Sequence, residues 1–171
     1  GNAKGVPNGK MVVLKKKNDY GIVVNVDSTK VKDGKFELKG KVKEPSMFAL
    51  FIKDLQQPIP FILETGEIEV KVDKDSIWKS EIGGTYNNEE FQKFNTKMNT
   101  VQKRLVDYQN KNFQKLMEAQ QKKDNMAIEN LKKGYNDIQK EMDDFMVKYP
   151  EENTEAFISL LLLQGQFNSP K

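Results

Sequence analysis

The hydrophobic pattern changes its period near the middle of the chain. Up to residue 86, apolar and charged side chains alternate, most clearly at Phe36, Leu38 and Val42 and again at Ile68 and Val70. A period of two is typical of antiparallel strands with one buried and one solvated face. We predict seven short strands: Met11–Leu14, Ile22–Val26, Lys35–Lys43, Met47–Ile52, Ile59–Leu63, Glu67–Asp73 and Ile77–Ile82.

Turn signals separate these strands. Asp33-Gly34 is the strongest, because glycine accepts a positive φ without a steric penalty; Asn8-Gly9 and Thr65-Gly66 are similar. Short strands with frequent turns predict a small antiparallel β-sandwich or open barrel. Met47–Ile52 is apolar on both faces, so we expect another element to cover its outer side. Trp78 shares a strand face with Ile82, so we expect it to be buried.

The second half follows a helical period. One apolar stripe comprises Phe91, Phe94, Met98, Val101, Leu105 and Tyr108, and another comprises Ile128, Leu131, Tyr135, Ile138, Met142, Phe145 and Tyr149. Spacings of three and four predict an antiparallel helical hairpin over residues 88–122 and 125–148. We expect Asp124 or Asn125 to cap the second helix and Pro150 to end it.

A short apolar helix, Glu155–Gln164, is predicted to follow the hairpin. Leucines fill positions 160–163 and cover every side of a helical turn, so we expect this helix to dock on the β-domain or on the hairpin. If a downstream domain normally covers it, the chain should form a homodimer through it; if the chain is complete, the helix should be enclosed within the monomer. The predicted fold is therefore α+β, with an antiparallel β-domain at 1–86 and a helical hairpin plus docking helix at 87–171.

Composition removes several kinds of chemistry. The 171 residues include no Cys and no His, which excludes disulfides, thiol nucleophiles, zinc sites of the Cys/His type and histidine bases. The net charge of +3 is weak, and we interpret the only basic run, Lys15–Lys17, as a solvated strand end, so no nucleic-acid partner is predicted. No apolar run approaches the roughly 20 residues of a transmembrane helix.

No residue set predicts catalysis, and we expect no enzyme activity. The adjacent or near-adjacent carboxylates lie in lysine-rich surroundings and are interpreted as surface charge: Glu89/Glu90, Asp143/Asp144, Glu151/Glu152 and Asp73/Asp75. Asp73–Ser76 lacks the glycine and the glutamate of a calcium loop, and Gly83-Gly84 lacks the spacing of a phosphate loop. We therefore predict no catalytic, cofactor-binding or metal-binding residue, and no cofactor.

One stretch carries a family signature. Val26–Pro45, VDSTKVKDGKFELKGKVKEP, resembles the N-terminal domain of unknown function of thioredoxin-like thiol:disulfide interchange proteins, chiefly envelope lipoproteins of Gram-negative gut bacteria. These belong to the alkyl hydroperoxide reductase and thiol-specific antioxidant superfamily. Further matches are Gly9–Leu14, Phe61–Ile68, Gly83–Asn87, and Tyr149-Pro150 before an apolar helix. The redox domain with its Cys-x-x-Cys is missing from this chain, so no catalytic residue can be transferred onto it.

The resemblance implies a cellular location and a kind of partner. We expect an exported protein, periplasmic or held at the outer membrane by a lipid attached upstream of residue 1, with its signal outside this sequence. The leading hypothesis is a non-catalytic binding or positioning module whose partner is another protein or a thioredoxin-like domain. The alternative is the accessory half of a thiol:disulfide oxidoreductase. A third hypothesis is a holdase-like chaperone that uses the charged hairpin.

Overall fold

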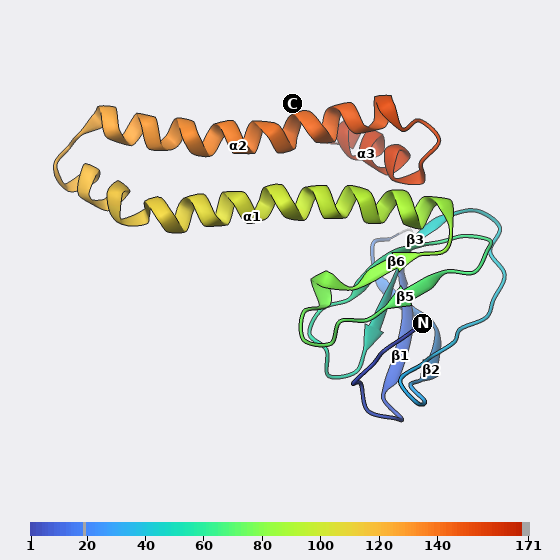
Figure 1. Ribbon diagram of the computed structural model, residues 1–171. Helices are drawn as coiled ribbons and strands as arrows, with labels where there is room; N and C mark the ends of the chain where they lie inside the picture. Colours follow the sequence, from blue (N-terminus) through green and yellow to red (C-terminus); the bar gives the residue numbers. More distant parts are fainter. Residues whose placement is uncertain (19, 169–171) are drawn as a thin grey trace. The chain divides into compact units, whose positions relative to one another are not determined.

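Figure 1 shows the computed structural model, which describes residues 1–18 and 20–168. In these residues the strands are β1 (Met11–Lys17), β2 (Val23–Lys30), β3 (Ser46–Ile52), β4 (Ile59–Leu63), β5 (Glu69–Lys71) and β6 (Glu81–Gly83). The helices are α1 (Tyr86–Gln121), α2 (Asn125–Glu152) and α3 (Phe157–Asn168), with a 3-10 turn, η1, at Ile77–Lys79. The predicted α+β class, antiparallel sheets followed by helices, is confirmed.

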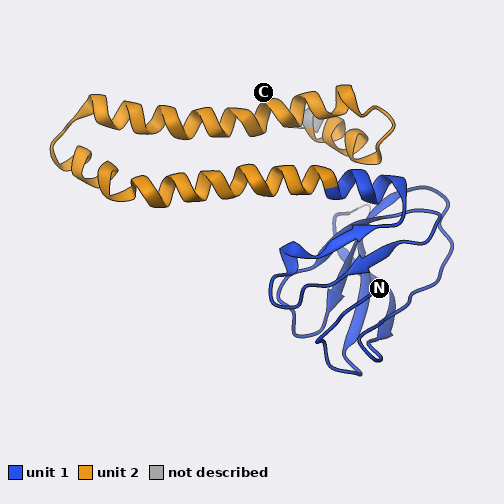
Figure 2. Ribbon diagram, in the orientation of Figure 1, with its two compact units in different colours: residues 1–92 blue, residues 93–171 orange. Residues whose placement is uncertain are grey.

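The chain divides into two compact units, residues 1–92 and 93–171, and the division falls within α1 (Figure 2). The first unit holds an open antiparallel sheet in the order β2-β1-β3-β4 and a separate pair, β5-β6. Alternate residues of the inner strands are buried, among them Val12, Leu14 and Leu50. Val70 of β5 and Ile82 of β6 join the same core, so both sheets contribute to one hydrophobic interior.

The turn at Asp33-Gly34 is confirmed, but the strand expected after it is not. Asp33 and Gly34 have φ of 51° and 70°, and Lys32 and Lys35 exchange two backbone hydrogen bonds of 2.8 and 2.9 Å. From Phe36 to Pro45 the chain forms no regular strand. Phe36 pairs with Gly1 through the backbone, and its side chain is buried. The side chain therefore enters the core as the alternation predicted, although this segment forms no regular strand.

The strand predicted at Ile77–Ile82 is also wrong in its first half. The Asp73 carboxylate accepts hydrogen bonds from the backbone N–H groups of Asp75 (3.1 Å) and Ser76 (2.8 Å), which turns the chain into η1. Such local side-chain bonds compete with strand formation. Trp78 lies on this turn and is 62% exposed, so its expected burial is wrong.

The outer face of β3 is partly covered, as its apolar sequence predicted. Met47, Ala49 and Phe51 are half-buried there. The Lys15 ammonium lies 4.3 Å from the centre of the Phe51 ring, so part of this cover is a cation–π contact from β1.

The second unit contains the predicted hairpin of α1 and α2. Its aromatic centre is Phe94, Phe145 and Tyr149, with ring centroids 5.0 to 5.5 Å apart. The Asp124 carboxylate accepts from Ala127 N–H (3.0 Å) and caps α2, as expected. Pro150 does not end α2, which continues to Glu152. Burial of Tyr149 and Pro150 offsets the hydrogen bond that proline cannot make in this last turn.

Helix α3 docks on the hairpin through α2. Ala156, Ile158 and Ser159 are buried, and the Ser159 hydroxyl donates to Asn153 O (2.6 Å). Leu160 and Leu163 are 49% and 41% exposed, so one face of this helix remains open. Among the described helices, none has the length and apolar character that a membrane span requires.

Candidate functional site

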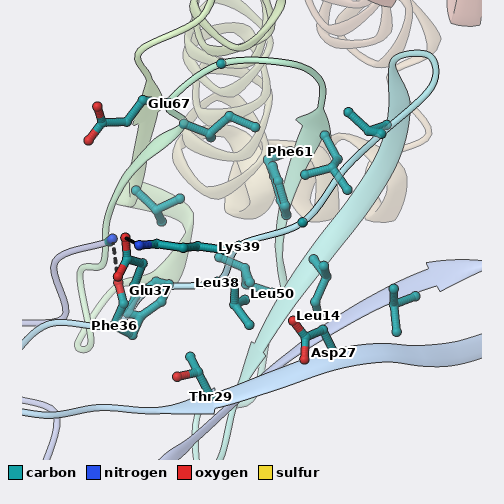
Figure 3. Close-up of a pocket in the computed structure, with 18 of the residues that line it drawn as sticks. Leu14, Asp27, Thr29, Phe36, Glu37, Leu38, Lys39, Leu50, Phe61 and Glu67 are labelled. Carbon is teal, nitrogen blue, oxygen red and sulfur yellow. Dashed lines mark hydrogen bonds and ion pairs between the residues drawn. The ribbon is translucent and has the colours of Figure 1, made fainter.

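An open cleft of about 1500 Å³ lies within the first unit (Figure 3). Its walls come from three parts of the chain: the strands of the larger sheet, the segment that follows the Asp33-Gly34 turn, and the stretch leading into β5. We call the segment 36–43 the crossing segment. The cleft is the candidate functional site because it joins an apolar floor to exposed backbone and charged side chains.

The floor of the cleft belongs to the hydrophobic core. Leu14 of β1, Leu50 of β3 and Phe61 of β4 line it and are at most 7% exposed. Phe36 and Leu38 of the crossing segment pack against the same core and line the cleft too. Strand alternation places these side chains on the inner face of each strand, so the floor is a direct consequence of the period-two pattern.

The backbone at one end of the cleft is already paired. Gly1 N donates to Phe36 O (2.8 Å), and Phe36 N donates to Gly1 O (3.1 Å). Asn2 bridges Lys35 in antiparallel fashion and Lys71 in parallel fashion. Residues 1 and 2 therefore hydrogen-bond to the start of the crossing segment on one side and to the β5 region on the other.

The backbone of the rest of the crossing segment has no strand partner among the described residues. Within the described part of the chain, residues 37–43 make no backbone–backbone hydrogen bond. Backbone N–H and C=O groups require partners, and on an exposed segment water supplies them. The cleft is thus bordered by backbone that has no strand partner among the described residues.

Charged side chains surround the floor. The lysines that line the cleft are Lys30, Lys32, Lys35, Lys39 and Lys41, and the acidic residues are Asp27, Glu37, Glu64 and Glu67. Lys39 and Glu37 form an exposed ion pair of 3.3 Å. Glu64 also accepts from the Asn87 backbone N–H (3.1 Å) and side-chain amide (2.6 Å), so this carboxylate holds the start of α1.

The carboxylates considered in the sequence do not gather into a metal site. Asp73 is engaged by its own loop through the bonds to Asp75 and Ser76. Among the described residues, no three acidic side chains lie where they could hold a metal ion together. Sequence reasoning missed the cleft itself. Its only sequence signal is the alternation over residues 35–43, which is typical of a paired strand.

The family model for a domain of unknown function, DUF4369, matches residues 1–91. The chain belongs to this family. Every residue that lines the cleft falls within the DUF4369 match, which ends one residue before the first compact unit does. Neither the curated proteins nor the solved structures include a match to the chain.

Proposed function

We propose that the chain is a non-catalytic binding or positioning module of the Gram-negative cell envelope. The observation that carries the binding role is the cleft, where an apolar floor borders unpaired backbone within the DUF4369 domain. The proposed location, periplasmic or anchored at the outer membrane by a lipid upstream of residue 1, rests on the resemblance to envelope lipoproteins. The same resemblance suggests a protein or a thioredoxin-like domain as the partner.

Site-specific photo-cross-linking in the native bacterium tests this function. Lys39→p-benzoylphenylalanine places the reactive group at the cleft rim, and Lys53→p-benzoylphenylalanine is the matched control, because Lys53 is exposed in the same unit outside the cleft. We expect a discrete cross-link from position 39 only, with the natural protein in the envelope fraction. Equal products at both positions, no product at position 39, or a cytoplasmic protein would contradict the proposal.

The alternative function is the accessory half of a thiol:disulfide oxidoreductase. It is favoured by the open face of α3, where Leu160 and Leu163 are exposed after Tyr149-Pro150, the position that precedes the thioredoxin-like domain in the proteins the chain resembles. A Cys-x-x-Cys downstream in the reading frame would support it. In that longer protein, Leu160→Glu with Leu163→Glu should separate the melting of the two domains, since both side chains are exposed here and neither is needed for folding.

A further inference from the structure

The hairpin formed by β1 and β2 extends beyond the strand that follows it in the sheet. β1 pairs with β3 only as far as Lys15, which lies opposite Ala49, whereas its pairing with β2 continues to Lys17, opposite Val23. The end of this hairpin is therefore a two-stranded ribbon closed by a loop. We call its described residues, 16–18 and 20–23, the β-hairpin tip.

Large apolar side chains are exposed at the β-hairpin tip. Tyr20, Ile22 and Val23 are 89%, 60% and 50% exposed. Single exposed apolar residues are common on protein surfaces, but a group of them in one place indicates an interaction surface. Three within four consecutive positions at the end of a ribbon form such a group.

Asn18 fixes the loop that presents these side chains. Its side-chain oxygen accepts hydrogen bonds from the backbone N–H groups of Tyr20 (3.0 Å) and Ile22 (2.9 Å). Asn18 N donates to Ile22 O, and Gly21 N donates to Asn18 O, both at 2.9 Å. Gly21 has a φ of 75°, which glycine adopts without strain. A loop held by four hydrogen bonds loses little conformational entropy when its apolar side chains bind.

Lysines lie directly behind the apolar end of the ribbon. Lys17 is opposite Val23, Lys16 is opposite Val24, and both lysines are exposed. Residues 15–23 contain three lysines against one aspartate, a net charge of +2. Apolar side chains at the extremity with cations behind them match the surface of a bilayer, where acyl chains lie beneath anionic headgroups. A tyrosine ring suits the boundary between these two layers.

We propose that the β-hairpin tip binds the surface of an anionic lipid bilayer. Tyr20, Ile22 and Val23 enter the boundary between headgroups and acyl chains, and Lys16 and Lys17 contact the anionic headgroups. The small size of the tip favours a bilayer over a protein, because a stable protein interface takes about 20–30 residues from each partner. This surface is separate from the cleft and does not depend on the binding function proposed for it.

Co-sedimentation of the 171-residue chain with lipid vesicles tests the proposal. One set of vesicles contains phosphatidylcholine alone, and the other contains phosphatidylcholine and phosphatidylglycerol in equal amounts. We expect binding to the anionic vesicles to be at least about tenfold tighter, and to weaken as the salt concentration rises. Equal binding to both sets, or no binding to the anionic set, would overturn the proposal.

Serine substitutions test the apolar contribution. Ile22→Ser with Val23→Ser should weaken binding to the anionic vesicles at least about tenfold. Met126→Ser with Val147→Ser is the matched control, because these side chains are 74% and 55% exposed on α2, and it should bind as the natural chain does. All four side chains are exposed, so urea unfolding should be unchanged and a loss of binding cannot be a loss of fold.

Glutamine substitutions test the charge in the same way. Lys16→Gln with Lys17→Gln should weaken binding to the anionic vesicles at least about tenfold. Lys132→Gln with Lys133→Gln removes the same charge from exposed residues of α2 and should leave binding nearly unchanged. Equal losses from the two pairs would show a response to net charge alone and would contradict binding through the β-hairpin tip.

Tryptophan fluorescence reports which part of the chain enters the bilayer. In a Trp78→Phe background, Tyr20→Trp should shift its emission to the blue on the anionic vesicles. Lys53→Trp in the same background should not, since Lys53 N donates to Met11 O (2.9 Å) at the opposite end of β1. A blue shift at position 53, or none at position 20, would refute insertion of the tip.

Discussion

Asn88 offers the sharpest test of how the first unit holds together. β4 is an edge strand, and the backbone of Ile62 within it has no strand neighbour on its outer side. The Asn88 side chain replaces that neighbour, since its amide oxygen accepts from Ile62 N–H (2.9 Å) and its amide nitrogen donates to Ile62 O (2.7 Å) and Thr85 Oγ1 (2.8 Å). Asn88 and Ile62 are both 0% exposed.

The expected cost of Asn88→Ala follows from these three bonds. At a net value of about 1 kcal/mol each, their loss destabilises the unit by about 3 kcal/mol. The Ile62 N–H and C=O would then be buried without partners, which raises the expected loss toward about 5 kcal/mol. Small domains have a total stability of only about 5–15 kcal/mol, so the effect is large.

Urea unfolding followed by Trp78 fluorescence measures this loss, because Trp78 is the only tryptophan and lies in the first unit. Hydrogen exchange at the Ile62 amide gives a local readout. Asn110→Ala is the control, since Asn110 is exposed on the same helix and the substitution there should be neutral or slightly stabilising. A loss below about 1 kcal/mol with unchanged Ile62 exchange would refute the argument.

Three further predictions concern the hairpin and the chemistry. Gly134→Ala should lower the melting temperature of the hairpin despite its gain in helix propensity, because the new Cβ would lie 2.2 Å from the Tyr108 hydroxyl oxygen; a higher melting temperature would show that the two helices separate at little cost. Hydrogen bonds from Arg104 and Lys97 hold the pKa of Glu141 below its ordinary value. The stabilisation of the hairpin by the ionised Glu141 is therefore fully present above the ordinary glutamate pKa, and it is lost as pH falls through the lowered pKa. The melting difference between the natural hairpin and Glu141→Gln should therefore disappear on acidification, and a difference that is independent of pH would contradict this. The chain alone should give no turnover in insulin reduction, because it has no cysteine, and sustained turnover by thioredoxin-free protein would refute this.

The helical half could be predicted closely because its information is local. Stripes at spacings of three and four define the buried faces of α1 and α2, and the Asp124 cap marks where the chain reverses. The error at Pro150 arose because proline within the last turn sacrifices only one hydrogen bond, which burial beside Tyr149 offsets. A sequence pattern does not show which side chains bury the proline, so it cannot predict whether burial offsets the lost hydrogen bond.

The β half was harder to predict because strands depend on distant partners. Asn88 had no signal beyond its place at a helix start, yet its side chain completes the edge of β4, 26 residues earlier in the sequence. Trp78 illustrates the opposite error, since local hydrogen bonds from backbone N–H groups to the Asp73 carboxylate and the Ser80 hydroxyl oxygen favoured a turn where alternation indicated a strand.

The crossing segment shows what alternation does and does not specify. Its apolar residues enter the core as the period of two predicts, with Phe36 buried and Leu38 packed against the core. Alternation describes where side chains point, whereas a sheet also needs a neighbouring backbone in register. Residues 37–43 meet the first condition and lack the second within the described fold. The alternation over residues 35–43 therefore predicted the direction of the side chains correctly, but it carried no information on whether a neighbouring strand is present.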